Sequence, residues 1–200
     1  MVKTHRLFGL ILVILLIGAC NRTPLPPVQN DPDLASPRND IAGLPNFAKI
    51  SDTLYRGAQP TAEGFKELKK MGVKTIINLH AFASDRDLIK GLGFQYLHIS
   101  FKTWHAEDED VVKFLKAVTD PANGVVFVHC EHGSDRTGMM VAIYRMFVQG
   151  WSFEKAIAEL PRFGFHETWQ NIRNYLKAFD VESMRHKVQS APNLKIEVVP

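Results

Sequence analysis

Residues 125–138 read VVFVHCEHGSDRTG, and this stretch decides the fold. Residues 125–128 are wholly apolar, which predicts a short buried strand. Residues 136–149 are apolar on nearly all sides, which predicts a central buried helix. Cys130 lies between the two, where an α/β sheet binds its ligands, just beyond the carboxyl end of a strand. The sequence therefore predicts a ligand site in a loop that joins a buried strand to a central helix.

The flanking sequence alternates in the same way between strand and helix patterns. Apolar runs at 73–79 and 94–99 predict two further strands, and residues 47–50 with 54–56 suit a hairpin. Helical spacing of apolar residues predicts helices at 61–71, from about 106–110 onward, at 152–160 and at 166–179. We therefore expect a single α/β domain with a central mixed or parallel sheet of about four or five strands, flanked by helices.

Length and composition fit one folded domain with appendages. The chain has 200 residues, of which 46% are hydrophobic and 22% charged, and this leaves no room for two large domains. Residues 20–45 are rich in proline, asparagine and aspartate, which predicts an extended linker. We expect the folded domain to span residues 46–180. Residues 181–200 carry little pattern and are expected to form a loose C-terminal tail.

Residues 1–19 have the pattern of a targeting segment. Lys3 and Arg6 precede an apolar run that is shorter than the roughly 20 residues of a membrane span. The quartet Ile17-Gly18-Ala19-Cys20 resembles the lipobox of bacterial lipoproteins, whose cysteine is lipidated and becomes the mature N-terminus. This resemblance implies a signal peptide, acyl chains such as palmitate on Cys20, and a stable membrane anchor. An uncleaved anchor or an ordinary secretory peptide is the alternative.

The lipobox also bears on localisation and on the second cysteine. Asn21 follows Cys20, which by analogy with lipoproteins indicates the outer membrane of the cell envelope, facing the periplasm. The chain has two cysteines, so a lipid on Cys20 leaves Cys130 without a disulfide partner. A lone thiol in an oxidising compartment indicates a functional residue.

The net charge of the chain bears on whether it binds nucleic acid. The formal net charge is +3, and Lys3 and Arg6 supply two of these charges, so +1 remains without residues 1–19. This excess is too small to indicate nucleic-acid binding. We expect a monomer.

The loop after the predicted strand combines the groups that hold a phosphate dianion. Arg136 offers a planar fork that can bind two phosphate oxygens, which lysine cannot do. The backbone N–H groups of the loop and the N-terminus of the next helix can converge on the same point, and Gly133 permits a conformation or a close approach closed to other residues. This positive environment favours the thiolate of Cys130. The predicted substrate-binding residues are Glu131, His132, Gly133, Ser134 and Thr137, whose hydroxyl is also placed to stabilise the thiolate.

His129-Cys130, five residues and then Arg136-Thr137-Gly138 together resemble the signature of the protein tyrosine and dual-specificity phosphatase superfamily, and in particular its bacterial dual-specificity-like members. The resemblance covers roughly residues 46–180 and includes 52–56 with Gln59-Pro60, and 144–151. It implies that Cys130 attacks phosphorus, that a phosphocysteine forms, and that water then releases phosphate. No metal or other cofactor is implied, because Arg136 and the loop amides stabilise the charge.

The general acid that protonates the leaving group is open. In the wider family an aspartate on a separate loop serves, but the matching residues 101–105 contain no carboxylate. Asp135 resembles the aspartate that precedes this arginine in lipid- and phosphoinositide-active relatives, where it has been proposed as the acid, and we favour it as the third catalytic residue. Asp108 and His105 are the alternatives.

The resemblance predicts an enzyme that hydrolyses phosphate monoesters of the phosphotyrosine or dual-specificity type. A phosphoinositide or inositol-phosphate phosphatase of the same superfamily is an alternative, because a phosphorylated protein, a small phosphoester and a phospholipid all present the same dianion. An alternative of another class is a catalytically weak phosphate-binding module or scaffold in the cell envelope. Arg56 is expected either to border the pocket or to form a surface ion pair.

Overall fold

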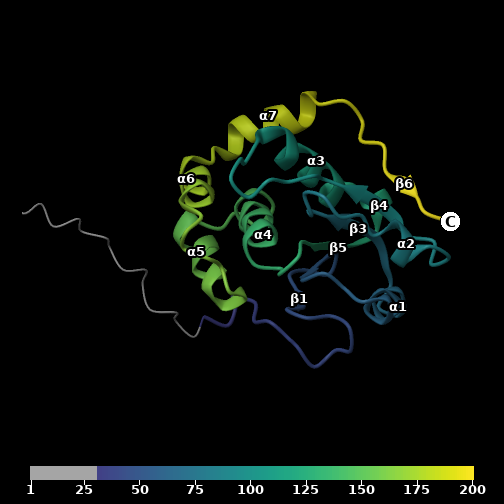
Figure 1. Cartoon of the computed structure of the whole chain (residues 1–200). Coiled ribbons are helices and arrows are strands. Elements are labelled where there is room, and N and C mark those ends of the chain that lie inside the picture. The colour runs from purple at the N-terminus through teal and green to yellow at the C-terminus, as the bar shows by residue number, and fades with distance from the viewer. Residues whose placement is uncertain (1–30) are drawn as a thin grey trace, which may run out of the picture.

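A six-stranded sheet lies at the centre of residues 31–200, the part of the chain that this computed structural model describes (Figure 1). The strands are β1 (Ala48–Lys49), β2 (Leu54–Gly57), β3 (Val73–Asn78), β4 (Gln95–His98), β5 (Val125–His129) and β6 (Glu197–Val198). Their order across the sheet is β1-β2-β5-β3-β4-β6. The four inner strands run parallel, and the edge strands β1 and β6 pair antiparallel to them.

Helices cover both faces of this sheet. They are α1 (Ala62–Lys70), α2 (Arg86–Ile89), α3 (Asp108–Thr119), α4 (Asp135–Phe147), α5 (Phe153–Ala158), α6 (Gln170–Ala178) and α7 (Val181–Ser190), with short 3-10 helices η1 (Pro121–Asn123) and η2 (Leu160–Phe163). Helices α1 and α2 cover one face, and α3 and α4 cover the other. Outside them, α5 and α6 contact α4 while α7 contacts α3 (Figure 1).

In strand β5 polar and apolar residues do not alternate, because both faces of the strand are buried. Val126 and Val128 pack into the apolar cluster that contains α4, and Phe127 packs into the cluster that contains α1. Successive side chains of a strand point to opposite faces, so a central strand covered on both sides needs apolar residues throughout. The apolar run therefore predicted the centre of the sheet correctly, and with it the start of the Cys130 loop.

The edge strand β6 makes the sheet larger than the four or five strands expected. Strand β1 comes from the predicted hairpin, and β6 comes from the predicted tail. The helix expected at 166–179 begins later, at Gln170, because residues 166–169 form a turn in which Trp169 N donates to His166 O over 3.1 Å. The α/β fold class and the remaining predicted helices are confirmed.

The prediction of a loose tail at 181–200 is wrong. Helix α7 is capped by Asp180, whose side chain accepts from Glu182 N and Ser183 N, and it contacts α3. Strand β6 then pairs with β4, and Glu197 forms an ion pair of 2.8 Å with Arg86. The segment carried little pattern because α7 buries only Met184, which is too little for a periodic signal.

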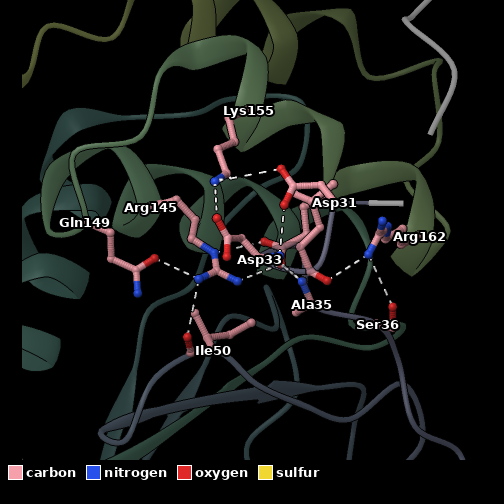
Figure 2. A network of polar contacts seen from close by, with 11 residues as sticks. Asp31, Asp33, Ala35, Ser36, Ile50, Arg145, Gln149, Lys155 and Arg162 are labelled. Carbon is pink, nitrogen blue, oxygen red and sulfur yellow. Dashed lines mark hydrogen bonds and ion pairs between the residues drawn. The ribbon is translucent and has the colours of Figure 1, made fainter. Parts of the chain in front are cut away.

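The linker prediction is wrong for residues 31–45, which pack onto the domain (Figure 2). Leu34 and Leu44 are buried, Asp33 pairs with Lys155 at 2.6 Å, and Arg162 donates to Leu34 O over 2.7 Å. Polar residues that suggested a solvated linker instead find partners on α5 and η2. The predicted signal peptide, Cys20 and the rest of the linker lie outside the described residues. Within residues 31–200, every helix is too short or too polar to cross a bilayer.

Candidate active site

The predicted loop lies where three parallel strands end side by side. Strand β5 ends at His129, which is paired with Gly57 of β2 on one side and Asn78 of β3 on the other. Cys130 follows at once as a buried free cysteine, and Asp135 begins α4. Arg136 is therefore in the first turn of the helix whose positive end faces the loop.

The carbonyl groups of this Cys loop (residues 130–136) are held from outside. Three successive oxygens accept hydrogen bonds: Glu131 O from Gln59 N (3.1 Å), His132 O from Asn46 Nδ2 (2.9 Å) and Gly133 O from Arg56 Nη2 (2.6 Å). In a trans peptide the carbonyl is antiparallel to the next N–H group. The N–H groups of His132, Gly133 and Ser134 therefore point to the opposite side, towards the inside of the loop. Such converging donors bind anions.

Gly133 is required by the geometry of the loop. Its φ is +69°, a conformation that residues with a side chain rarely adopt. A Cβ atom there would lie 2.6 Å from Ala58 N and from the carbonyl carbon of Gly57. Both expected reasons for this glycine, the backbone conformation and the close approach, are thus present.

Arg56 supports the loop from beneath and is not on the surface. It is 1% exposed, its guanidinium lies 3.7 Å from the ring centre of Phe163, and Nη2 donates to Gly133 O. Burial lowers the pKa of Arg56 to about 10, although the negative charges of Glu159 and Cys130 oppose the shift. It therefore stays protonated at neutral pH and adds positive charge beside Cys130.

Within residues 31–200, the guanidinium of Arg136 has only long polar contacts with its neighbours. Its Nη1 donates to Leu79 O over 3.4 Å, and its Nη2 lies 3.7 Å from the carboxylate of Glu131. Both distances are at or beyond the limit of a good hydrogen bond. The two nitrogens can therefore exchange these partners for a ligand at little cost.

The other predicted loop residues differ in exposure. Glu131 and His132 are exposed, whereas Ser134 is buried and its Oγ donates to His132 O over 3.3 Å. Thr137 is fully buried, and its Oγ1 is one of the few buried side-chain atoms in residues 31–200 without a hydrogen-bond partner. Four of the five predicted substrate-binding residues thus lie in the Cys loop, and Thr137 follows it directly in α4.

Of the three candidates for the general acid, only Asp135 belongs to the Cys loop. It is buried, its Oδ1 accepts from His166 N over 2.8 Å, and its Oδ2 lies 2.9 Å from His166 Nδ1. Asp108 instead binds Lys187 and the hydroxyl of Tyr175, and these hydrogen bonds lower the pKa of Asp108. That shift keeps Asp108 ionised, which does not suit a proton donor.

His105 lies at an exposed turn. Its backbone N donates to Lys102 O over 2.9 Å, and its Nε2 lies 2.7 Å from the carboxylate of Glu107. This turn contains Trp104, which is more than half exposed. The turn is held to α6 by Asn171, whose Nδ2 donates to Thr103 O over 2.7 Å.

Three residues that hold the loop were not predicted from the sequence. They are Asn46 and Gln59, which bind loop carbonyls, and Asp85, whose Oδ2 lies 2.9 Å from Nε2 of His129. Gln59 occurred in the motif that resembles the phosphatases, which was the one available signal. Asn46 and Asp85 lie in segments without a motif, and only the folded chain brings them to the loop.

No group of three or more His, Cys, Asp or Glu side chains within residues 31–200 is arranged to hold a metal ion. The acidic cluster at 107–110 is divided among different partners. Asp108 binds Lys187, Glu107 pairs with His105, and Glu109 pairs with Lys113.

Known proteins are similar to this chain in sequence and in fold. A sequence model described as "Tyrosine phosphatase family" matches residues 43–197. The dual specificity protein phosphatase TpbA of Pseudomonas aeruginosa (strain UCBPP-PA14) is 33% identical over 146 residues, which cover 70% of this chain and 65% of TpbA. The inositol diphosphatase DSP3 of Arabidopsis thaliana is 28% identical over 155 residues, which cover 73% of this chain and 76% of that protein.

The likeness extends to three dimensions. A crystal structure of P. aeruginosa TpbA, with its cysteine replaced by serine and in complex with pTyr, has a TM-score of 0.70 and 26% sequence identity. The match covers 82% of this chain and 100% of that one. The chain spans just under two thirds of the length of the curated TpbA that it matches. Because the family match includes both the sheet and the Cys loop, the chain belongs to the tyrosine phosphatase family.

Proposed function

We propose that this protein is a cysteine-dependent phosphatase that hydrolyses phosphate monoesters of the phosphotyrosine or dual-specificity type. The observation that carries the proposal is the Cys loop, in which three successive carbonyls accept hydrogen bonds from Gln59, Asn46 and Arg56. Peptide geometry then directs the opposite N–H groups into the loop. Cys130 lies at one end of this loop and Arg136 at the other. The related TpbA is named a dual specificity phosphatase, and its serine variant binds pTyr.

The reaction then follows in two steps. The thiolate of Cys130 attacks phosphorus, so that a sulfur–phosphorus bond forms and the bond to the leaving oxygen breaks. Water next attacks the phosphocysteine, which breaks the sulfur–phosphorus bond and releases inorganic phosphate. In both steps the loop N–H groups, the start of α4 and Arg136 stabilise the negative charge on the phosphoryl oxygens.

We assign Asp135 as the general acid, which gives a proton to the leaving oxygen. Asp135 is in the Cys loop itself, and its carboxylate lies 2.9 Å from His166 Nδ1. From this position a carboxyl group can give a proton to the leaving oxygen in the first step and accept one from the attacking water in the second. The ionised Asp108 and the exposed His105 have other partners.

An inositol phosphate or diphosphate is a second candidate substrate. The 28% identity to the Arabidopsis inositol diphosphatase DSP3 favours it. A comparison of kcat/KM for a phosphotyrosine peptide, a phosphoinositide in micelles and an inositol diphosphate will identify the preferred class. We expect the phosphotyrosine peptide to be preferred, because the more similar relative is TpbA.

The activity is tested with the full chain and an aryl phosphate. We expect release of inorganic phosphate, inhibition by vanadate, and a loss of roughly 10⁴-fold or more in Cys130→Ser, since removal of a nucleophile has effects of this order. Cys20→Ser is the matched cysteine control and should retain activity. Binding of phosphate without turnover by the unmodified protein would instead identify a phosphate-binding module or scaffold.

We also propose that a lipid on Cys20 anchors a monomeric protein to the bacterial cell envelope, at the outer membrane and facing the periplasm. The lipobox-like residues 17–20 support this, with Asn21 after the cysteine. In a Gram-negative host the full chain should sediment with the outer membrane, whereas Cys20→Ser should be released in soluble form. Analytical ultracentrifugation of that soluble variant tests whether it is a monomer.

A further inference from the structure

A buried carboxylate lies next to the Cys loop, outside the sequence motif. Asp85 is 1% exposed and lies at the residue before α2. Its partner His129 is fully buried, with its ring stacked on Phe127 and edge-on to Phe65. Burying a carboxylate among such groups is unfavourable unless hydrogen bonds compensate. The carboxylate is therefore expected to have a role.

Both oxygens of this carboxylate are bound, each to a residue that reaches the Cys loop. Oδ2 lies 2.9 Å from Nε2 of His129, and Oδ1 accepts from Gln59 Nε2 over 2.7 Å. The backbone N of Asp85 donates to the hydroxyl of Tyr96 over 3.0 Å, which holds the aspartate itself in place. Burial by itself raises the pKa of Asp85, but the hydrogen bonds from His129 and Gln59 outweigh it, and the pKa is lowered.

These contacts connect Asp85 to the chain on both sides of Cys130. His129 directly precedes the cysteine, and its carbonyl accepts from Leu79 N over 2.8 Å. Glu131 directly follows the cysteine, and its carbonyl accepts from the backbone N of Gln59 over 3.1 Å. One carboxylate thus restrains the residue before the sulfur through the imidazole and the residue after it through Gln59.

The same contacts fix the proton on His129. An ionised carboxylate only accepts, so Nε2 carries a hydrogen, and Nδ1 has no other partner within the described chain. The other charged or titratable groups in or next to the Cys loop are Arg56, His80, Glu131, His132, Asp135 and Arg136. None of these forms a hydrogen bond or an ion pair with Asp85, although the charge of Asp85 opposes the lowering of the pKa of His80.

We propose that Asp85 is a positioning residue, which through His129 and Gln59 holds Cys130 in its reactive orientation and keeps the thiolate facing the loop donors. The inference rests on the proposed phosphatase function, but its consequence for the sulfur does not require turnover. Without the carboxylate, His129 and Gln59 lose their common acceptor and the thiolate loses its fixed position. A less well placed thiolate forms at higher pH and reacts more slowly.

The test is alkylation of Cys130 by iodoacetamide in the full chain, measured from about pH 5 to about pH 9, with Cys130→Ser as background. Asp85→Asn keeps the shape and removes the charge. We expect it to alkylate about ten-fold more slowly at about pH 6 and to approach the wild-type rate near pH 9, as for a shift of about one pH unit. Asp87→Asn, an exposed aspartate in α2, is the matched control and should behave as wild type.

A second variant keeps the inference testable if Asp85→Asn does not fold. Gln59→Leu removes the side-chain contact to Asp85 and a long one of 3.4 Å to Pro60 O, and it keeps the backbone contact to Glu131. We expect a smaller shift of the alkylation profile in the same direction. Wild-type profiles in the folded variants would overturn the inference. A shifted profile in a protein that hydrolyses no phosphoester would leave Asp85 as a positioning residue and reject the proposed function instead.

Discussion

Two buried charged clusters flank α4, and they differ in how completely their hydrogen bonds are formed. In the first, the support cluster, Arg145 donates from Nε and Nη2 to Glu159 over 3.1 and 2.7 Å. Arg145 Nη1 also donates to Ile50 O and to Gln149 Oε1 (Figure 2). Glu159 Oε1 accepts in addition from Ala35 N over 2.6 Å. Every nitrogen of the guanidinium and both oxygens of the carboxylate have a partner.

The second cluster surrounds the Cys loop and is incomplete. Five buried side-chain atoms of residues 31–200 have no hydrogen-bond partner, and four of them belong to residues in or next to this loop: Arg56 Nε, His80 Nδ1, His129 Nδ1 and Thr137 Oγ1. The fifth is Arg173 Nε. Buried polar atoms without partners destabilise a protein, so such a concentration calls for an explanation.

The difference separates a structural role from a chemical one. A charged pair with all its partners fixes α4 against α5 and the segment before β1. A loop surrounded by buried polar atoms without partners is less stable by itself, and departures from complete pairing are expected at functional sites. Disrupting the support cluster should therefore lower stability, whereas changes in the Cys loop should lower activity.

The support cluster gives the largest expected effect. Glu159→Ala leaves the buried charge of Arg145 without its partner, and loss of one partner of a buried ion pair costs about 3–5 kcal/mol. We expect a loss of this size in the free energy of unfolding, measured by urea denaturation with tryptophan fluorescence. Glu154→Ala, an exposed glutamate in α5, is the control and should change stability by about 0.5 kcal/mol or less. A loss below about 1 kcal/mol in Glu159→Ala would contradict the structural role.

Arg136→Lys tests the chemical side of the comparison. Lysine keeps the positive charge but not the planar fork, so we expect kcat/KM for an aryl phosphate to fall about 100- to 1000-fold, as on loss of one donor to a developing anion. The free energy of unfolding should stay within about 0.5 kcal/mol of wild type, because the contacts of Arg136 are long. Arg185→Lys in α7 serves as control. If Arg136→Lys instead lost stability and kept its activity, Arg136 would have a structural role and not a chemical one.

Asp135→Asn tests the general acid. Aryl esters release a stable phenolate and depend little on protonation, whereas alkyl esters depend on it strongly, so we expect about a 100-fold loss on an alkyl phosphate and a clearly smaller loss on an aryl phosphate. The ratio of kcat/KM for the two esters is the measurement. Asp108→Asn should leave that ratio unchanged. Equal losses of Asp135→Asn on both esters would exclude Asp135 as the acid.

The elements that could be predicted from the sequence are those with a local signal. Strand β5 is an uninterrupted apolar run, α4 is apolar nearly all round, and the spacing of Cys130 and Arg136 resembles a known signature. Burial on both faces and the geometry of the loop follow from these residues alone. The centre of the fold and the main residues of the candidate site could therefore be predicted from the sequence.

The elements that were missed have no local signal. Strand β6 has two residues, which is too short for periodicity, and α7 buries a single residue. Asp85 lies 44 residues before His129, and Asn46 lies 86 residues before His132, so each acquires its role only through tertiary contact. Supporting residues of this kind are found from the structure, not from the sequence pattern.

His80 gives the smallest expected effect, and it depends on pH. Burial, and then the charge of Arg136, lower the pKa of His80 from its ordinary value of 6.5, although Glu131 opposes the shift. The folded protein therefore holds this proton less tightly than the unfolded chain. His80 contributes stability above pH 6.5, and this contribution is lost as the pH falls through the lower folded value. In His80→Gln we expect Tm to fall less between about pH 7 and about pH 5 than in wild type.

Two further variants sharpen this test. His186→Gln changes an exposed histidine of α7 and should leave the pH dependence of Tm as in wild type. Glu131→Gln removes the charge that opposes the shift at His80, so its Tm should fall more steeply towards low pH than that of wild type. A shallower dependence in Glu131→Gln would mean that Arg136 and burial do not control His80. The surroundings of Cys130 would then be less positive than the loop geometry indicates, and the contrast with the support cluster would weaken.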